Sequence, residues 1–189
     1  MYAARTRRTA RRIPHSARAD VLEPLDEAVD HVRGPASARV VLEYGDYQCP
    51  YSRAAVRSIE RVESRLSGGV RFAFRHFPLT EIHPHALAAS LAAEAASAQD
   101  RFWEMHELLF HRQKALEADD LGRYATELGL DRARFERDRG GEEASARVLR
   151  DVRSGVASGE VQGTPTIFID GAVYRGNYET ETLLDVLAR

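Results

Sequence analysis

Cysteine is almost absent from this sequence, because Cys49 is the only one among 189 residues. A lone cysteine cannot form an internal disulfide, so no covalent bridge holds the fold together. Most single cysteines are small buried apolar residues. A reactive role for Cys49 must therefore rest on its neighbours in the chain.

Long apolar runs are absent as well. No segment approaches the roughly 18–20 apolar residues that a membrane-spanning helix needs, and the Ala-rich stretch 86–98 is interrupted by Ser90, Glu94 and Ser97. The first twenty residues are rich in arginine but lack the apolar core of a secretory signal. Their resemblance to a transit peptide is weak, because basic blocks are usually solvated tails. We expect no membrane span and a cytoplasmic protein.

Lysine occurs once, at Lys114, and the basic side of the composition is otherwise arginine. The 27 basic and 29 acidic residues give a formal net charge of −2. A nucleic-acid-binding domain usually carries a strong basic surplus, so no nucleic-acid partner is expected. The length and the 43% hydrophobic content fit one domain and a tail.

The predicted domain begins after a boundary near Gly34–Pro35, with residues 1–36 as a disordered basic tail or linker and residues 37–189 as the folded part. Residues 39–44 and 70–77 have the short apolar pattern of strands. Between them, a helix is predicted from Pro50, since proline is tolerated at the first helical position. Strand, helix and strand in about forty residues form a right-handed βαβ unit by default.

The second half of the chain begins with helical texture from about residue 84 to 158, interpreted as three or four helices in one insertion. Residues 166–169 and 172–175 flank Asp170–Gly171, a strong hairpin signal. A final amphipathic helix is predicted over 180–187. The fold class is therefore α/β, with a central mixed sheet of about four strands.

Cys49 lies where that sheet meets the first helix. The thiolate is the nucleophilic form of cysteine, and a helix N-terminus stabilises negative charge with its free N–H groups and its dipole. The strand before it places the thiol at the carboxyl edge of the sheet, where open α/β sheets bind ligands. These neighbours favour a reactive cysteine.

The segment Glu43-Tyr44-Gly45-Asp46-Tyr47-Gln48-Cys49-Pro50-Tyr51-Ser52 resembles the active-site segment of DsbA-like thioredoxin-fold thiol-disulfide oxidoreductases. The resemblance continues, in order, through four more segments and covers roughly residues 30–188. These are Phe74-Arg75-His76-Phe77-Pro78-Leu79, His83-Pro84-His85-Ala86, Phe102-Trp103-Glu104-Met105-His106 and Gly163-Thr164-Pro165-Thr166. It implies a thioredoxin fold whose helical insertion is of the DsbA type.

The resemblance also implies roles for individual residues. Pro165 should follow a cis peptide bond and face Cys49, with the Thr164 backbone pairing with an extended substrate, whereas the alternative is an ordinary trans turn. Pro50 and Tyr51 should contact substrate. Glu43 should be a buried acid that serves proton transfer; alternatively, its carboxylate reaches solvent or an arginine.

Ser52 is the main departure, because the family usually has a second cysteine there. A serine cannot release a mixed disulfide by attack, so the cycle must be monothiol, with an outside thiol resolving the adduct. The Ser52 hydroxyl could donate to the thiolate, or it could be only a first-turn helix residue. The expected partners are protein or small-molecule disulfides and thiols, with a low-molecular-weight thiol of the glutathione type as co-substrate.

Two other functions stay open beside monothiol exchange. One is a peptide- or protein-binding module that has lost redox cycling, since function lies in the site and not in the fold. The other is a glutathione-transferase-like enzyme of the kind that works with a serine-containing site. The order of the two residues argues against it, because Cys49 occupies the nucleophile position and Ser52 the resolving position.

No bound cofactor and no metal site are expected. Zinc sites take three or four nitrogen or sulfur ligands, and the spacings of the seven histidines do not suggest such a set. His83 and His85 flank a proline, and His106 and His111 are five residues apart.

Overall fold

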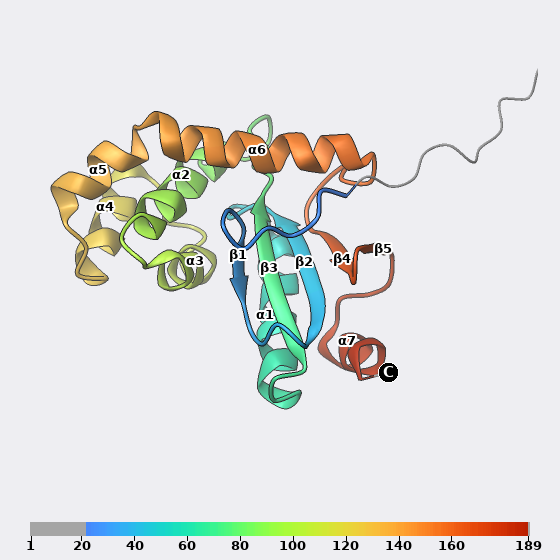
Figure 1. Cartoon of the computed structure of the whole chain (residues 1–189). Helices are drawn as coiled ribbons and strands as arrows, with labels where there is room; N and C mark the ends of the chain where they lie inside the picture. Colours follow the sequence, from blue (N-terminus) through green and yellow to red (C-terminus); the bar gives the residue numbers. More distant parts are fainter. Residues whose placement is uncertain (1–21, 189) are drawn as a thin grey trace, which may run out of the picture.

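The computed structural model describes residues 22–188, which form a five-stranded mixed sheet with helices packed around it (Figure 1). The strand order is β1-β3-β2-β4-β5, and only the β2–β3 pair is parallel. The elements of this part are β1 (His31–Arg33), β2 (Arg39–Gly45), α1 (Pro50–Arg65), β3 (Val70–His76), β4 (Thr166–Ile169), β5 (Ala172–Tyr174) and α7 (Thr180–Leu187).

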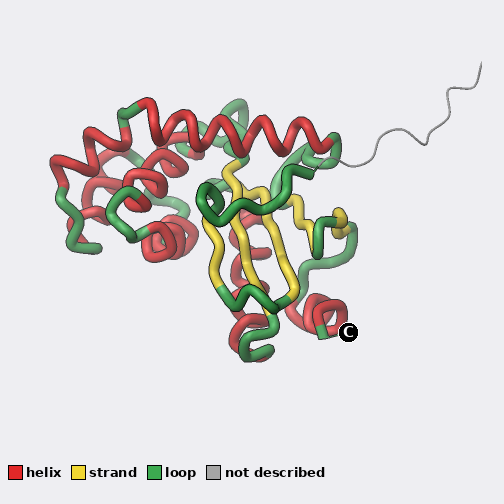
Figure 2. Tube along the Cα trace, in the orientation of Figure 1, coloured by secondary structure: helices red, strands yellow, loops and turns green. Residues whose placement is uncertain are grey.

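Five further helices lie between β3 and β4, and most of them gather at one end of the sheet (Figure 2). They are α2 (Ala86–Ser97), α3 (Phe102–His111), α4 (Ala118–Glu127), α5 (Arg132–Arg139) and α6 (Glu142–Ser158). The long α6 runs back across the sheet and packs on β3 (Figure 1). Between β3 and β4 the chain thus leaves the sheet to form the helical insertion and returns to it along α6.

The alternation along β2 divides the core between the two faces of the sheet. Val41 packs with the apolar residues of α1, α2, α3 and α7 in the larger cluster. Leu42 and Tyr44 point to the opposite face, where they meet Phe168 in a smaller cluster. Side chains two apart share a face, so Glu43 lies on the same face as Val41, towards α1.

The predicted boundary at residue 36 is too late. The described part of the predicted tail includes β1, which pairs antiparallel with β3 and makes the sheet five-stranded, not four-stranded. Leu22 and Leu25 pack against the smaller core cluster, and Asp30 is buried. The remainder of the predicted tail, residues 1–21, lies outside the described residues.

No helix in the region 22–188 combines the length and the apolar character that crossing a bilayer demands.

Candidate active site

Cys49 is the N-cap residue of α1 and is almost fully buried, with 3% of its surface exposed. Pro50 occupies the first helical turn, where its missing N–H leaves no hydrogen bond unmade. A helix N-terminus carries free N–H groups and the positive end of the helix dipole; no hydrogen bond joins the Cys49 side chain to the N–H groups of this turn. The thiol therefore lies where a negative charge is stabilised.

The loop before β4 approaches this thiol from across the site. The Cys49 Sγ donates to the carbonyl oxygen of Thr164, 3.3 Å away. The Thr164–Pro165 peptide bond is cis. A surface cavity of about 410 Å³ extends along this loop, between Glu160, Thr164 and Arg175. The family resemblance was the only basis for predicting that Cys49 and Pro165 share one site. In the structure the Cys49 thiol lies beside the residue that precedes Pro165.

Asp46 organises the turn that presents Cys49. Its Oδ1 accepts from the backbone N–H groups of Gln48 and Cys49, at 2.7 and 3.2 Å. Its Oδ2 accepts from the backbone N–H of Leu79 at 2.8 Å and from His83 Nδ1 at 2.9 Å. Asp46 is fully buried, so one carboxylate satisfies three backbone donors that would otherwise be lost.

The helical insertion also supports the cysteine loop. The side-chain amide of Gln113 donates to the carbonyl oxygens of Tyr47 and Cys49, at 2.8 and 2.7 Å. In the other direction, Gln48 Oε1 accepts from the backbone N–H of His85 at 2.8 Å. The insertion is thus part of the site, because it holds the backbone on both sides of the thiol.

Ser52 lies on the first turn of α1 and is fully buried. Its hydroxyl oxygen accepts from the backbone N–H of Asp46 at 3.2 Å. Among the hydrogen bonds of the described residues, none joins this hydroxyl to the Cys49 sulfur. Ser52 therefore ties the helix to the preceding loop.

Glu43 lies on the central strand, between β3 and β4, and is fully buried. Neither carboxylate oxygen has a hydrogen-bond partner, so the alternative in which it reaches solvent or an arginine is wrong. Burial, and secondly the neighbouring Cys49, raise the pKa of Glu43 well above its usual range. The neutral form of Glu43 is therefore favoured, and the charge of Cys49 contributes to this preference.

A second surface cavity, of about 450 Å³, opens beside the start of α1. Pro50 is among its lining residues, with Arg53 and Lys114 as its cationic groups and Glu117 as its acid. Tyr51 is 65% exposed next to this region, which leaves its ring free for contact. The substrate-binding roles of Pro50 and Tyr51 stay predictions.

Sequence reasoning did not identify Asp46, His83 and Gln113 as parts of the site. Asp46 had one available signal, since an acid three residues before a helix cap often accepts backbone N–H groups. His83 and Gln113 lie 34 and 64 residues from Cys49, and their spacing gives no indication of contact. The predicted absence of a metal site stays untested.

Comparison with known proteins agrees with this arrangement. The family model described as thioredoxin matches residues 26–189. The Na(+)/H(+) antiporter NhaA 1 of Salinispora arenicola is 40% identical over 188 residues, which cover 93% of this chain but only 28% of the antiporter. The chain thus spans little more than a quarter of the length of such curated relatives.

Solved structures match over most of both chains. A thioredoxin-like oxidoreductase from Silicibacter pomeroyi superposes with a TM-score of 0.74 at 26% identity, covering 86% of this chain and 92% of that one. BdbD from Bacillus subtilis superposes with a TM-score of 0.74 at 22% identity, covering 85% and 92%. The chain therefore belongs to the thioredoxin family and has the fold of its DsbA-like thiol-disulfide oxidoreductases.

Proposed function

We propose that this protein catalyses thiol–disulfide exchange through Cys49 alone, with an external thiol completing each cycle. The observation that carries the proposal is the pairing of the Cys49 thiol with the Thr164 carbonyl oxygen at 3.3 Å, while the residue three positions on is Ser52. The site has a thiol at a helix N-terminus and a backbone edge beside it. It has no second sulfur.

The first step is attack of the Cys49 thiolate on one sulfur of a substrate disulfide. An S–S bond forms between Cys49 and that half of the substrate, and the other half leaves as a thiolate. Glu43 is a fully buried acid whose pKa is raised in part by the Cys49 charge. We assign Glu43 to proton exchange with the sulfur centre.

The second step needs an outside thiol, whose thiolate attacks the substrate-half sulfur of the mixed disulfide. The mixed disulfide breaks, Cys49 returns as a thiolate, and the outside thiol leaves in a disulfide with the substrate half. Across the cycle one substrate disulfide and one thiol become one thiol and a new disulfide, so electrons balance. Ser52 has no sulfur with which to attack the mixed disulfide, and its hydroxyl oxygen accepts from the Asp46 N–H.

The surroundings of Cys49 suggest where the two reactants bind. The Thr164 backbone is an edge on which an extended peptide can pair. The cavity beside Pro50 carries Arg53 and Lys114 and suits the carboxylates of a small peptide thiol such as glutathione. Protein disulfides are thus proposed to use the first surface and the resolving thiol the second.

Ser52→Cys tests whether only the resolving thiol is missing. The buried serine lies three residues after Cys49, so a cysteine there supplies an internal thiol at the family's usual spacing. We expect the variant to reduce insulin with a dithiol reductant at least about tenfold faster than wild type, since an internal thiol acts at a high effective concentration. The readout is insulin turbidity over time.

Ser64→Cys is the matched control, because this serine lies on the same helix but is exposed. It adds a thiol without the spacing, and its rate should equal that of wild type. A Ser52→Cys rate that also equals wild type would contradict the proposal. If Cys49→Ala still captures the same substrates, the protein is instead a binding module. If the wild-type protein conjugates glutathione to an electrophile, it is instead a transferase.

The similarity to NhaA antiporters favours a second candidate, in which the domain serves as a redox-responsive part or partner of a Na(+)/H(+) antiporter. In that role, mixed-disulfide formation at Cys49 would change ion exchange. The test compares sodium-driven proton flux in vesicles that carry such an antiporter with this domain, before and after oxidised glutathione. An equal flux with wild type and Cys49→Ser would exclude this role.

A further inference from the structure

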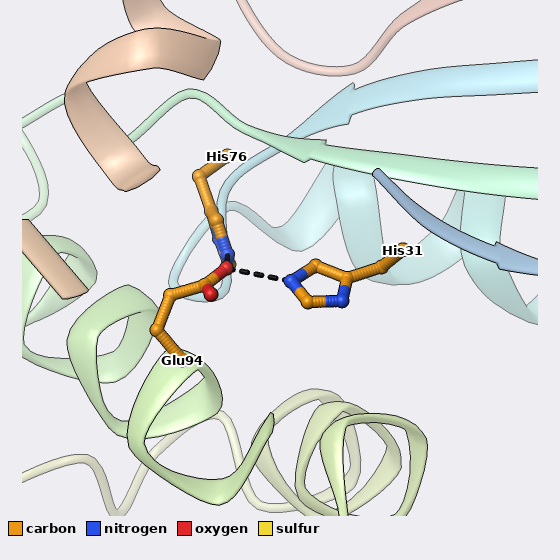
Figure 3. A group of neighbouring side chains, drawn as sticks. All are labelled: His31, His76 and Glu94. Atoms are coloured by element: carbon orange, nitrogen blue, oxygen red, sulfur yellow. Dashed lines mark hydrogen bonds and ion pairs between the residues drawn. The ribbon is translucent and has the colours of Figure 1, made fainter. Parts of the chain in front are cut away.

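Two histidines and a glutamate meet at one point, where the edge strand β1 and the end of β3 face α2 (Figure 3). Nε2 of His31 and Nε2 of His76 each lie 2.7 Å from the same atom, Glu94 Oε1. The three ligand-type atoms lie within 4.8 Å of one another. In the described part of the chain this is the one such group of three.

The three side chains are held by the fold and not by local sequence. His76 is fully buried, Glu94 is 9% exposed, and His31 is stacked on Phe102 with ring centroids 3.4 Å apart. In the sequence, His76 lies 18 residues from Glu94, and His31 lies 63 residues from it. The group is therefore pre-organised, so binding an ion would require little loss of side-chain freedom.

We propose that His31, His76 and Glu94 form a binding site for a single divalent transition-metal ion, with Zn²⁺ as the best fit. Two imidazole nitrogens and one carboxylate are a common zinc ligand set, which leaves a fourth position for water. Ca²⁺ and Mg²⁺ prefer oxygen ligands and do not suit a site with two imidazoles.

The spacing of the donor atoms is close to what a tetrahedral ion needs. Zinc lies about 2.0–2.2 Å from nitrogen and oxygen ligands, which places neighbouring ligand atoms about 3.3 Å apart. The two observed contacts of 2.7 Å to Glu94 Oε1 must each lengthen by about 0.6 Å to reach this spacing.

An opening to solvent lies next to the group. A surface cavity of about 820 Å³ is lined by His31 and Glu94 and by Glu142 and Glu143 on α6. Three cations also line it, Arg134, Arg137 and Arg147, of which Arg134 is paired with Asp138 and Arg147 with Asp151. The cavity gives an ion a path inwards and room for the water that would complete its shell.

The outer shell of the site is incomplete, which limits its affinity. His76 Nδ1 is buried and has no hydrogen-bond partner. With a metal on Nε2, the proton of this neutral ring moves to Nδ1, where nothing accepts it. Outer-shell partners of metal-bound histidines typically contribute 10–100-fold in affinity, so we expect weaker binding than at a complete structural zinc site.

The experiment is a calorimetric titration of Zn²⁺ into the full chain, stripped with a chelator and with Cys49 alkylated so that its thiol cannot bind metal. We expect saturation at one ion per chain and a rise in melting temperature with Zn²⁺, because ligands that bind the folded state stabilise it. Ca²⁺ at the same concentration should give neither effect. Co²⁺ should give the visible absorption of a four-coordinate ion.

Glu94→Gln and His31→Gln identify the ligands, and His111→Gln, at an exposed histidine of α3, is the matched control. We expect each of the first two to weaken Zn²⁺ binding at least about tenfold, with the control unchanged. Circular dichroism establishes that the variants are folded. The wild-type titration tests the site even where a variant fails to fold.

Absence of saturable Zn²⁺ binding to wild type, or binding that His31→Gln and Glu94→Gln retain at full strength, would overturn the proposal. The three residues would then be a hydrogen-bonded brace between β1, β3 and α2. This outcome is separate from the exchange activity, because Cys49 is blocked in the titration and free in the exchange assays.

Discussion

Glu43 and Asp46 are two buried acids three residues apart whose hydrogen bonds differ on either side of one strand end. Asp46 accepts four hydrogen bonds, which hold the loop before Cys49. Glu43 accepts none and is equally buried, so its neutral form is favoured. The environment, and not the residue type, thus separates a loop-forming acid from an acid available for proton exchange.

The raised pKa of Glu43 predicts a pH dependence of stability. Its stabilising contribution is complete below the ordinary glutamate pKa of about 4.3 and is lost as pH rises towards the higher folded-state value. The Gln side chain of Glu43→Gln cannot ionise, so this variant does not lose stability in the same way. Between pH 5 and pH 8, the free energy of unfolding of the variant relative to that of wild type should rise by at least about 1 kcal/mol, because a tenfold change in proton affinity is worth about 1.4 kcal/mol.

Urea unfolding of both proteins at the two pH values measures this difference. Glu81→Gln, at an exposed position, controls for the loss of a negative charge. Parallel pH profiles for wild type and Glu43→Gln would show that the buried carboxyl does not control stability.

At the scale of elements, the end of β2 determines where the thiol stands. Gly45 is the last residue of β2, and a Cβ there would lie 2.4 Å from Phe74 Cε2 and 3.0 Å from Glu43 Oε1. The strand can therefore pass over Phe74 and the buried acid only without a side chain at this position. The loop that follows presents Cys49 to the Thr164 carbonyl.

Gly45→Ala is expected to destabilise the fold by about 1–3 kcal/mol, because added volume in a close-packed core forces its neighbours to move. Phe74 is fully buried and has little room to give. Thermal and urea unfolding measure the change. Gly140→Ala is the control, since its nearest neighbour would be 3.7 Å away, and equal losses in the two variants would contradict the packing argument.

At the scale of the whole molecule, the segment before β2 joins the sheet to the helical insertion. Asp30 pairs with Arg75 of β3 through two bonds of 2.9 and 2.8 Å, and both side chains are fully buried. Arg150 of α6 also donates to Asp30, at 2.8 Å. One carboxylate thus connects the N-terminal segment, the sheet and the helix that returns from the insertion.

Asp30→Asn should cost about 3–5 kcal/mol of stability at neutral pH, because removing one partner leaves the Arg75 charge buried without compensation. The measurement is the free energy of unfolding in urea. Glu181→Gln breaks an exposed ion pair with Arg65 and should change it by less than about 1 kcal/mol. Similar small losses in both variants would show that the buried pair of Asp30 and Arg75 contributes little to the stability of the fold.

Sequence alone predicted the elements that carry strong periodicity or turn chemistry. The strand at 166–169 and the helix at 180–187 have the predicted bounds, and α1 begins at the predicted Pro50. The three-residue β1 was missed because His31-Val32-Arg33 has too few apolar residues to show a period. Its pairing with β3 depends on buried contacts of Asp30 that no local pattern encodes.

The site divides in the same way. Cys49, Thr164 and Pro165 were predicted together because the sequence resembled a family, since 115 residues separate Cys49 from Thr164. The hydroxyl of Ser52 was predicted as a possible donor to the thiolate; its oxygen accepts from the Asp46 N–H, and its donor role stays a prediction. The group of His31, His76 and Glu94 exists only in three dimensions, and one member lay in the predicted tail.

The most direct test of the central claim is the intact mass of wild-type protein during reaction with oxidised glutathione. The single-cysteine mechanism predicts one glutathione adduct per chain, on Cys49, which is stable until reduced glutathione is added and is then released. Cys49→Ser should form none. A wild-type protein that forms no adduct, or an adduct that added thiol does not release, would contradict it.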